Sequence, residues 1–120
     1  MILNVELKNK RITVLTEEID SDTSTLKIMA SDNTELVALK FPNPCALGIE
    51  NGEVTFNQLS EEMVLITGEA SKAEIQYSDG SVIASITVTD ENGNGEIKLR
   101  RTSLLAGDLI RLTEWKIREL

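Results

Sequence analysis

The chain has 120 residues, 12 of them basic and 20 acidic, for a net charge of −8. This length predicts one domain with a single core, and an apolar content of 41% predicts a folded chain rather than a disordered one. The negative charge argues against nucleic acid as a partner, because a broad phosphate-binding face depends on lysine and arginine.

Catalytic chemistry has few candidate residues here. The chain has no histidine, and Cys45 is its only cysteine, so an intrachain disulfide and a cysteine-based zinc site are both excluded. A nucleophile would need an activating base, so we interpret Cys45 as a small buried apolar residue. We expect a protein that is not an enzyme, with no catalytic residues and no cofactor. We also expect a cytoplasmic protein without a membrane partner, because neither a signal-peptide pattern nor an apolar run of roughly 20 residues is present.

The first segment, residues 1–22, fits two patterns. One set of apolar residues alternates as in a strand (Leu3, Val5 and Leu7), and another recurs at helical spacing (Leu7, Ile12, Leu15 and Ile19). Asn4 is a suitable helix N-cap. We therefore favour a helix that ends near Ile19, with a hairpin as the alternative.

Residues 23–120 have a β pattern throughout. Short runs of strand-forming residues are separated by turn signals, with no helical pattern between them. The predicted segments are 25–30, 35–41, 54–57, 63–67, the hairpin 73–89, 96–100 and 109–117. About eight such strands predict a mainly β domain, an antiparallel β-sandwich of immunoglobulin-like or jelly-roll-like type.

The hairpin at residues 73–89 has the clearest predicted register. Asp79-Gly80 fits a two-residue turn with positive φ at both positions. Such a turn places apolar residues opposite one another in three pairs, Tyr77 with Val82, Ile75 with Ala84 and Ala73 with Ile86.

The last predicted strand, 109–117, changes phase. Ile110 and Leu112 have one parity, and Trp115 and Ile117 have the other. Either both faces of the strand are buried or a bulge shifts it. We expect the single tryptophan to be buried against the sheet, because the chain has too few aromatic residues for a sugar-binding platform.

Residues 90–96 resemble the first half of a calcium-binding loop. Asp90, Asn92 and Asn94 alternate, and glycine follows at the expected position. Arg101, however, occupies the position where a bidentate glutamate is needed, and strands flank the segment. We favour a plain hairpin loop, with no bound metal, over a calcium site.

Charge is unevenly distributed along the chain. Residues 1–97 carry 6 basic and 17 acidic side chains, whereas residues 98–120 carry 6 basic and 3 acidic ones. Lys98, Arg100 and Arg101 fit the solvent face of a strand better than an anion site. We favour charge pairing between neighbouring strands over the alternative, a molecule with one acidic and one basic side suited to head-to-tail contacts.

Short motifs follow one another in a recognisable order along the chain: Leu36-Val37-Ala38-Leu39-Lys40-Phe41, Asn51-Gly52-Glu53-Val54, Thr67-Gly68-Glu69-Ala70, Asp79-Gly80-Ser81-Val82-Ile83 and Thr102-Ser103-Leu104-Leu105-Ala106-Gly107-Asp108. This order resembles that of a group of small structural proteins from the head region of tailed bacteriophages and prophages. The chain departs from that group at Ala73-Glu74, where an aromatic residue is expected.

The resemblance implies a virion or prophage structural protein with a helix that leads into a β-sandwich. Its expected function is capsid decoration or cementing, or a role at the head–tail junction, through contacts with other virion proteins and with copies of itself. It would reside in the host bacterial cytoplasm during assembly and in the virion afterwards. The alternative is a β-sandwich module that binds carbohydrate or a host surface.

Overall fold

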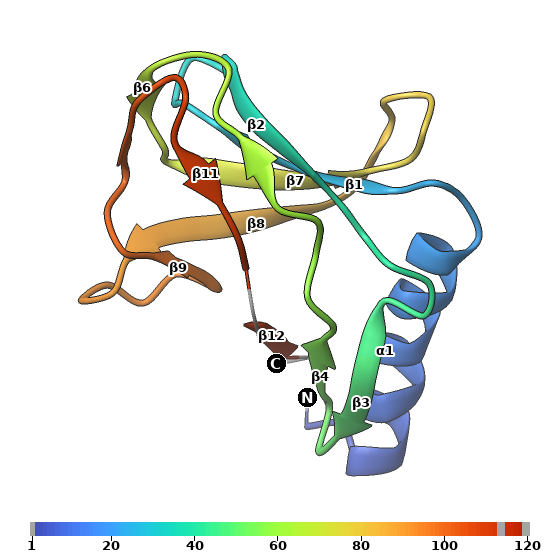
Figure 1. Ribbon diagram of the computed structural model, residues 1–120. Helices are drawn as coiled ribbons and strands as arrows, with labels where there is room; N and C mark the ends of the chain where they lie inside the picture. The colour runs from blue at the N-terminus through green and yellow to red at the C-terminus, as the bar shows by residue number, and fades with distance from the viewer. Residues whose placement is uncertain (1, 113–114, 119–120) are drawn as a thin grey trace.

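The computed structural model describes residues 2–112 and 115–118 (Figure 1). The fold is mainly β, as predicted: 43% of the structure is strand and 14% is helix, and the described residues contain one helix. The helix is α1 (Val5–Asp20). The strands are β1 (Thr25–Met29), β2 (Glu35–Lys40), β3 (Ala46–Glu50), β4 (Glu53–Phe56), β5 (Glu62–Met63), β6 (Gly68–Glu69), β7 (Lys72–Gln76), β8 (Val82–Asp90), β9 (Ile97–Leu99), β10 (Ser103–Leu104), β11 (Leu109–Ile110) and β12 (Trp115–Arg118).

The N-terminal segment is a helix, so the hairpin alternative for residues 1–22 is wrong. Asn4 is the N-cap, and its Oδ1 accepts a hydrogen bond of 2.8 Å from the backbone N–H of Leu7. Ile12, Thr16 and Ile19 form the buried face, which packs mainly on β3, β4 and β8. The helix therefore belongs to the same core as the strands. Among the described residues, no helix has the length and apolar character needed to cross a membrane.

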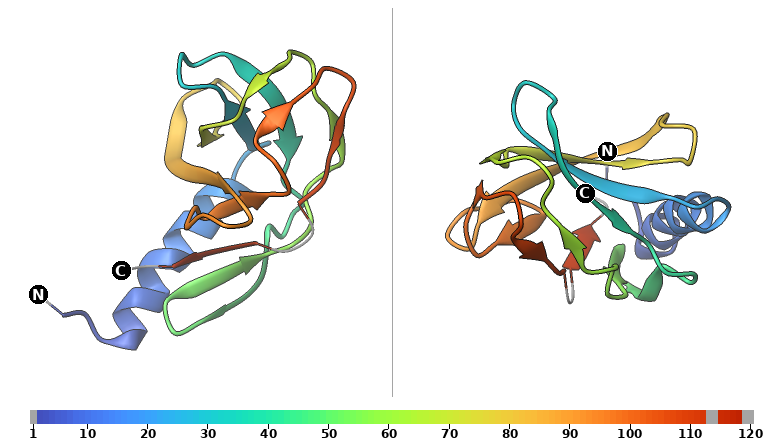
Figure 2. Two further views of the ribbon diagram at one scale, coloured as in Figure 1. Left: turned by 90° about the vertical axis from the view of Figure 1, so that its left-hand side faces the viewer. Right: turned by 45° about the horizontal axis from the view of Figure 1, so that its top comes forward.

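The strands form curled sheets. The largest has the order β2-β1-β7-β8-β9, and a second has the order β12-β4-β3. Two-residue ladders join β11 to β5 and β10 to β6. The segment that contains β5 also lies beside β2, through hydrogen bonds from the Leu65 N–H to the Leu36 carbonyl (2.9 Å) and from the Ser60 N–H to the Lys40 carbonyl (3.0 Å). The strands thus curl from β9 at one end, through β8, β7, β1 and β2, to β5 and β11 at the other (Figure 2).

One ladder is parallel, which departs from the wholly antiparallel arrangement that the sequence predicts. β8 and β9 pair in parallel, with Val88 opposite Ile97 and Asp90 opposite Leu99. The hairpin loop predicted at residues 90–96 is therefore wrong: the chain folds back along β8 and then reverses before it enters β9. Ile97 and Leu99 of β9 are both buried.

The β7–β8 hairpin is present, but its turn differs from the prediction. Ala73 pairs with Ile86 and Ile75 with Ala84, as predicted. A bulge after Ile75 then shifts the register, so that Val82 pairs with Gln76 and the predicted pair of Val82 with Tyr77 is wrong.

The cause of this shift is a longer turn. The Gly80 N–H donates to the Tyr77 carbonyl and the Tyr77 N–H to the Ser81 carbonyl, which makes a three-residue loop. Gly80 has a φ of +88°, but the φ of Asp79 is not positive, so the predicted two-residue turn with positive φ at both positions does not form. A three-residue loop with glycine in the left-handed region produces this bulge.

Two other predicted strands are shorter than expected. Of residues 63–67 only Met63 is in a strand. The predicted strand 109–117 is two strands, β11 and β12, which pair with β5 and β4 respectively. The phase change therefore comes from an interruption between two strands, not from one strand buried on both faces or bulged. Residues 113 and 114 lie outside the described residues.

Candidate interaction surface

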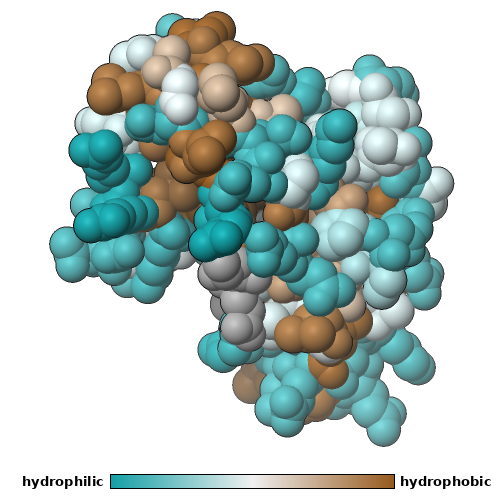
Figure 3. All heavy atoms as spheres, in the orientation of Figure 1, coloured by the Kyte–Doolittle hydropathy of each residue, from teal (hydrophilic) through white to brown (hydrophobic). Residues whose placement is uncertain are grey.

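Five large apolar side chains are exposed together at one end of the molecule. They come from the neighbouring segments 63–66 and 105–109 and are between 50% and 69% exposed: Met63, Leu65, Ile66, Leu105 and Leu109. We call this set the apolar crown. Figure 3 shows hydrophobic residues gathered at the upper left, over the region of β6 and β11. The sequence does not predict this surface, because apolar residues in short β-runs are expected to point inward.

The crown is held by hydrogen bonds between its two segments. The Val64 N–H donates to the Asp108 carbonyl (2.8 Å), and the Gly107 N–H donates to the Val64 carbonyl (2.9 Å). The Asp108 carboxylate in turn accepts from the Leu105 N–H (3.0 Å). Gly107 has a φ of +98°, which suits glycine at the tip of this turn. The exposed side chains are therefore displayed on braced loops.

A groove lies beside the crown, between the β9 and β11 ends of the curled strands. One cavity of about 460 Å³ and another of about 600 Å³ share Lys98, Arg111 and Leu112 among their lining residues. We call these two adjoining cavities together the seam; it is lined by residues 91, 95, 96, 98–101 and 104 of the β9 region and by residues 108–112, 115 and 116 of the β11 and β12 region. Leu99 and Leu112 are buried and Ile110 is half-buried, so the floor of the seam is apolar.

The strands that line the seam have open edges. Within the described residues β9 pairs only with β8, β11 only with β5, and β12 only with β4. No backbone hydrogen bond crosses the seam in that part of the chain. The outer N–H and C=O groups of these strands are therefore available for pairing with another extended chain.

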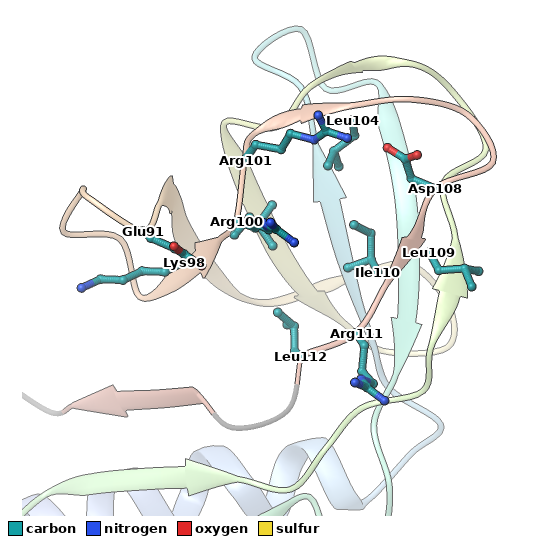
Figure 4. Close-up of a pocket in the computed structure, with 11 residues that line it drawn as sticks. Glu91, Lys98, Arg100, Arg101, Leu104, Asp108, Leu109, Ile110, Arg111 and Leu112 are labelled. Carbon is teal, nitrogen blue, oxygen red and sulfur yellow. The ribbon is translucent and has the colours of Figure 1, made fainter.

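The seam is also rich in cationic side chains. In Figure 4, Arg100 and Arg101 extend from the β9 side toward Leu104 and Ile110, whereas Lys98 points away from the groove. Within the described residues, none of Lys98, Arg100, Arg101 and Arg111 is part of an ion pair.

The basic C-terminal segment divides into residues that pair with a neighbouring strand and residues that line the seam. Lys116 and Arg118 pair with Glu53 on the neighbouring strand, at 3.8 and 3.3 Å, as cross-strand pairing predicts. Arg100, Arg101 and Arg111 line the seam instead.

An acidic end lies opposite the seam. Glu18, Asp22 and Asp79 gather where the C-terminal end of α1 meets the β7–β8 turn: the Tyr77 hydroxyl donates to Glu18 (3.0 Å), and the Ser78 N–H donates to Asp22 (3.0 Å). The bond to Glu18 raises the pKa of Tyr77, and the Ser78 backbone and hydroxyl donors lower the pKa of Asp22. β8 runs from this end to the seam, and its nine residues span roughly 30 Å.

Three of the four aromatic side chains, Phe41, Phe56 and Trp115, form an internal cluster and not a platform. Trp115 and Phe56 are both buried, as predicted for Trp115, and Phe41 and Tyr77 are half-buried. The Trp115 Nε1 is also buried and has no hydrogen-bond acceptor among the described residues. A sugar-binding surface needs an exposed aromatic face, and none of the four aromatic residues of this chain provides one.

The calcium-loop residues lie in the loop between β8 and β9. Asp90 Oδ1 accepts from the backbone N–H of Asn92 (2.9 Å), and the side chains of Asn92 and Asn94 make no hydrogen bond with Asp90 in the described structure. The described residues contain no group of three or more Asp, Glu, His or Cys side chains that could hold a metal ion. A calcium site at Asp90, Asn92 and Asn94 therefore remains a prediction that we do not favour.

The glycines of this loop have a packing role. A Cβ at Gly93 would lie 2.5 Å from the Cβ of Thr89, and one at Gly95 would lie 2.8 Å from the Thr89 backbone nitrogen. The Gly95 N–H also donates to Thr89 Oγ1 (3.0 Å). Close contact with β8 thus accounts for glycine at both positions without a metal.

Cys45 is fully buried, as predicted. Burial, and then the neighbouring Asp20 carboxylate, raise the pKa of its thiol to about 12. Its backbone N–H donates to Asp20 (2.9 Å), which ties the residues before β3 to the end of α1.

Comparison of the chain with known protein families, with curated proteins and with solved structures finds no match. The crown, the seam and the charge distribution are the structural features of this chain that bear on its function.

Proposed function

We propose that this protein is a non-catalytic assembly protein of a tailed bacteriophage or prophage, a capsid decoration or cement protein or a component of the head–tail junction. The apolar crown is the observation that carries the proposal. Contiguous exposed apolar patches are uncommon on proteins that act alone and mark sites of association. The motif order along the chain supports a phage source.

In this proposal the curled sheets serve as a rigid scaffold of β-sandwich type, immunoglobulin-like or jelly-roll-like. The scaffold displays the crown at one end, on loops joined by the Val64–Asp108 and Gly107–Val64 hydrogen bonds. Braced loops favour binding because little conformational freedom is lost when a partner docks.

The charge distribution supports partners of complementary surface. The seam presents Arg100, Arg101 and Arg111 beside the crown, and the acidic end presents Glu18, Asp22 and Asp79. Opposite charges at two ends align molecules as they meet and disfavour the reversed orientation. We therefore propose contacts with other virion proteins and between copies of this chain. No observation favours the carbohydrate-binding alternative, since Trp115 is packed inside the molecule.

Particle binding tests this function. The tagged protein is produced in the bacterium whose genome encodes it, phage particles are induced and banded on a density gradient, and the protein is quantified in the particle fraction. We expect the wild-type protein in that fraction, and a Leu65→Ser/Leu109→Ser variant reduced at least about tenfold, as for loss of central interface residues.

Val82→Ser is the matched control, because Val82 is similarly exposed, at 48%, but lies outside the crown. It should bind particles as the wild-type protein does. Absence of the wild-type protein from every particle fraction, or equal binding by the crown variant when both are folded, would count against the proposal.

A further inference from the structure

We infer that the seam accepts a β-strand from a partner protein: an extended segment with alternating apolar and acidic residues, which inserts between β9 and β11. This inference deepens the proposed assembly function and rests on it for the identity of the partner as a virion protein. The site itself is argued from strand edges, floor and charge.

The open edges determine the form of the partner. β9 and β11 line the same cavity of about 460 Å³, and each has a ladder partner on only one side within the described residues. An unpaired edge presents alternating N–H donors and C=O acceptors, and an extended peptide satisfies both. Residues 96–101 would span about 20 Å if extended, which is the length of a strand of about six residues.

The apolar floor and the cationic rim of the seam determine the sequence of the partner strand. Side chains of a strand alternate between two faces, so one set would point to the floor at Leu99 and Leu112 and the other away from it. Arg100, Arg101 and Arg111 are exposed at the rim, and none is part of an ion pair within the described residues. A strand with apolar residues toward the floor and carboxylates toward the rim matches both surfaces.

A peptide fits this site better than a nucleic acid. Phosphate oxygens only accept hydrogen bonds, so a phosphate backbone held by the arginines would leave the carbonyl groups of both strand edges unpaired, whereas a peptide backbone pairs with them. The acidic end of a second copy of this chain is also unsuited to be the inserted segment. Glu18 lies on a helix and Asp79 in a tight turn, and both already accept hydrogen bonds. The segment therefore belongs to another protein.

A peptide-binding measurement tests the inference. The probe is a terminally blocked heptapeptide of alternating valine and glutamate, titrated into the full-length protein. Trp115 lines the seam and is the only tryptophan, so its fluorescence reports binding. Amide chemical shifts of residues 98–101 and 109–112 locate the peptide. We expect saturable binding below about 1 mM, with slower hydrogen exchange of these amides.

Matched peptides and variants separate strand addition from simple charge attraction. A probe with proline at its centre should lose binding, because proline cannot donate to a ladder, and a glutamine probe should bind several-fold more weakly. Arg100→Glu/Arg101→Glu should weaken binding at least about tenfold. Lys10→Glu/Lys40→Glu makes the same change in net charge at exposed residues outside the seam, and it should bind as the wild type does.

Each other outcome contradicts the inference. It fails if the wild-type protein does not bind the probe, if the proline probe binds equally, or if a single-stranded oligonucleotide shifts the same amides more strongly. It also fails if the seam amides become protected from hydrogen exchange as the protein concentration rises without the probe, because the strand that pairs there then comes from a second copy. If the probe binds but no particle contains the protein, the phage assembly function is contradicted and strand binding at the seam is not. If the probe does not bind and particles contain the wild-type and Arg100→Glu/Arg101→Glu proteins equally, strand binding at the seam is contradicted and the assembly function is not.

Discussion

Trp115 stacks on Phe56, with ring centroids 4.3 Å apart and ring planes at 19°. The two residues are direct cross-strand partners in the β12–β4 ladder. Phe41 lies 5.8 Å from Phe56 and 6.2 Å from Trp115, between ring centroids. Three of the four aromatic side chains of this chain thus meet in one place. This cluster attaches the C-terminal strand to the rest of the core.

Truncation of Phe56 should therefore strongly destabilise the protein. Phe56→Ala removes a fully buried ring and the stacking partner of Trp115. We expect the free energy of unfolding to fall by about 3–5 kcal/mol, as for other buried phenylalanines. Urea denaturation followed by circular dichroism measures it. Phe41→Ala is the control: its ring is half-buried, so its loss should be clearly smaller. Equal losses would mean that the stack is not the centre of the cluster.

Gly52 should tolerate no side chain. Its φ is +73°, and a Cβ there would lie 2.8 Å from the Cβ of Lys8 on α1. Gly52→Ala combines backbone strain with a steric clash, so we expect a loss of about 2–4 kcal/mol in the free energy of unfolding.

Two other glycines separate these causes. Gly80 has a φ of +88° but nothing within 4 Å of an added Cβ, so Gly80→Ala should cost only the strain, about 1–2 kcal/mol. Gly48 has neither a positive φ nor a neighbour within 4 Å, so Gly48→Ala should be nearly neutral. A Gly52→Ala loss no larger than that of Gly80→Ala would show that the helix yields to the added methyl group.

Cys45 should be unreactive in the folded protein. Its side chain is fully buried, and the pKa of its thiol is raised to about 12, so the thiolate is almost absent at pH 8. We expect negligible labelling by iodoacetamide at that pH and complete labelling in guanidinium chloride, measured by intact mass. A Ser85→Cys variant, exposed on β8, should label readily at its new thiol alone. Rapid native labelling at Cys45 would show that the region around β3 opens.

Asp22 should make stability depend on pH in the acidic range. Hydrogen bonds from Ser78 lower its pKa in the folded protein, below the ~3.9 of an unfolded chain. The depressed pKa contributes stability that is present above about pH 4 and is lost as the pH falls through the folded pKa. Asp22→Asn should therefore destabilise the protein at pH 7, and the difference from wild type should shrink in thermal melts as the pH falls below about 4. A difference that does not change with pH would contradict this.

Several elements could be predicted because their causes are local. The Asn4 side chain needs only the first turn of α1 to cap it. Asn51-Gly52 needs only its own left-handed conformations, φ of 53° and 73°, to turn β3 into β4. The predicted pairing of Tyr77 with Val82 is wrong for an equally local reason, since a three-residue loop and a two-residue turn can share the same Asp-Gly sequence.

The sequence by itself determined the mainly β composition, the N-terminal helix, the burial of Cys45 and Trp115, and the excess of positive charge after residue 97, because these follow from residue types and short-range patterns. Only the tertiary structure decided that β9 runs parallel to β8, that segments 63–66 and 105–109 meet with their apolar side chains outward, and that Arg100 and Arg111 line one groove. These depend on pairing between residues distant in the chain, where many registers satisfy the same alternation and only packing of the whole core selects one.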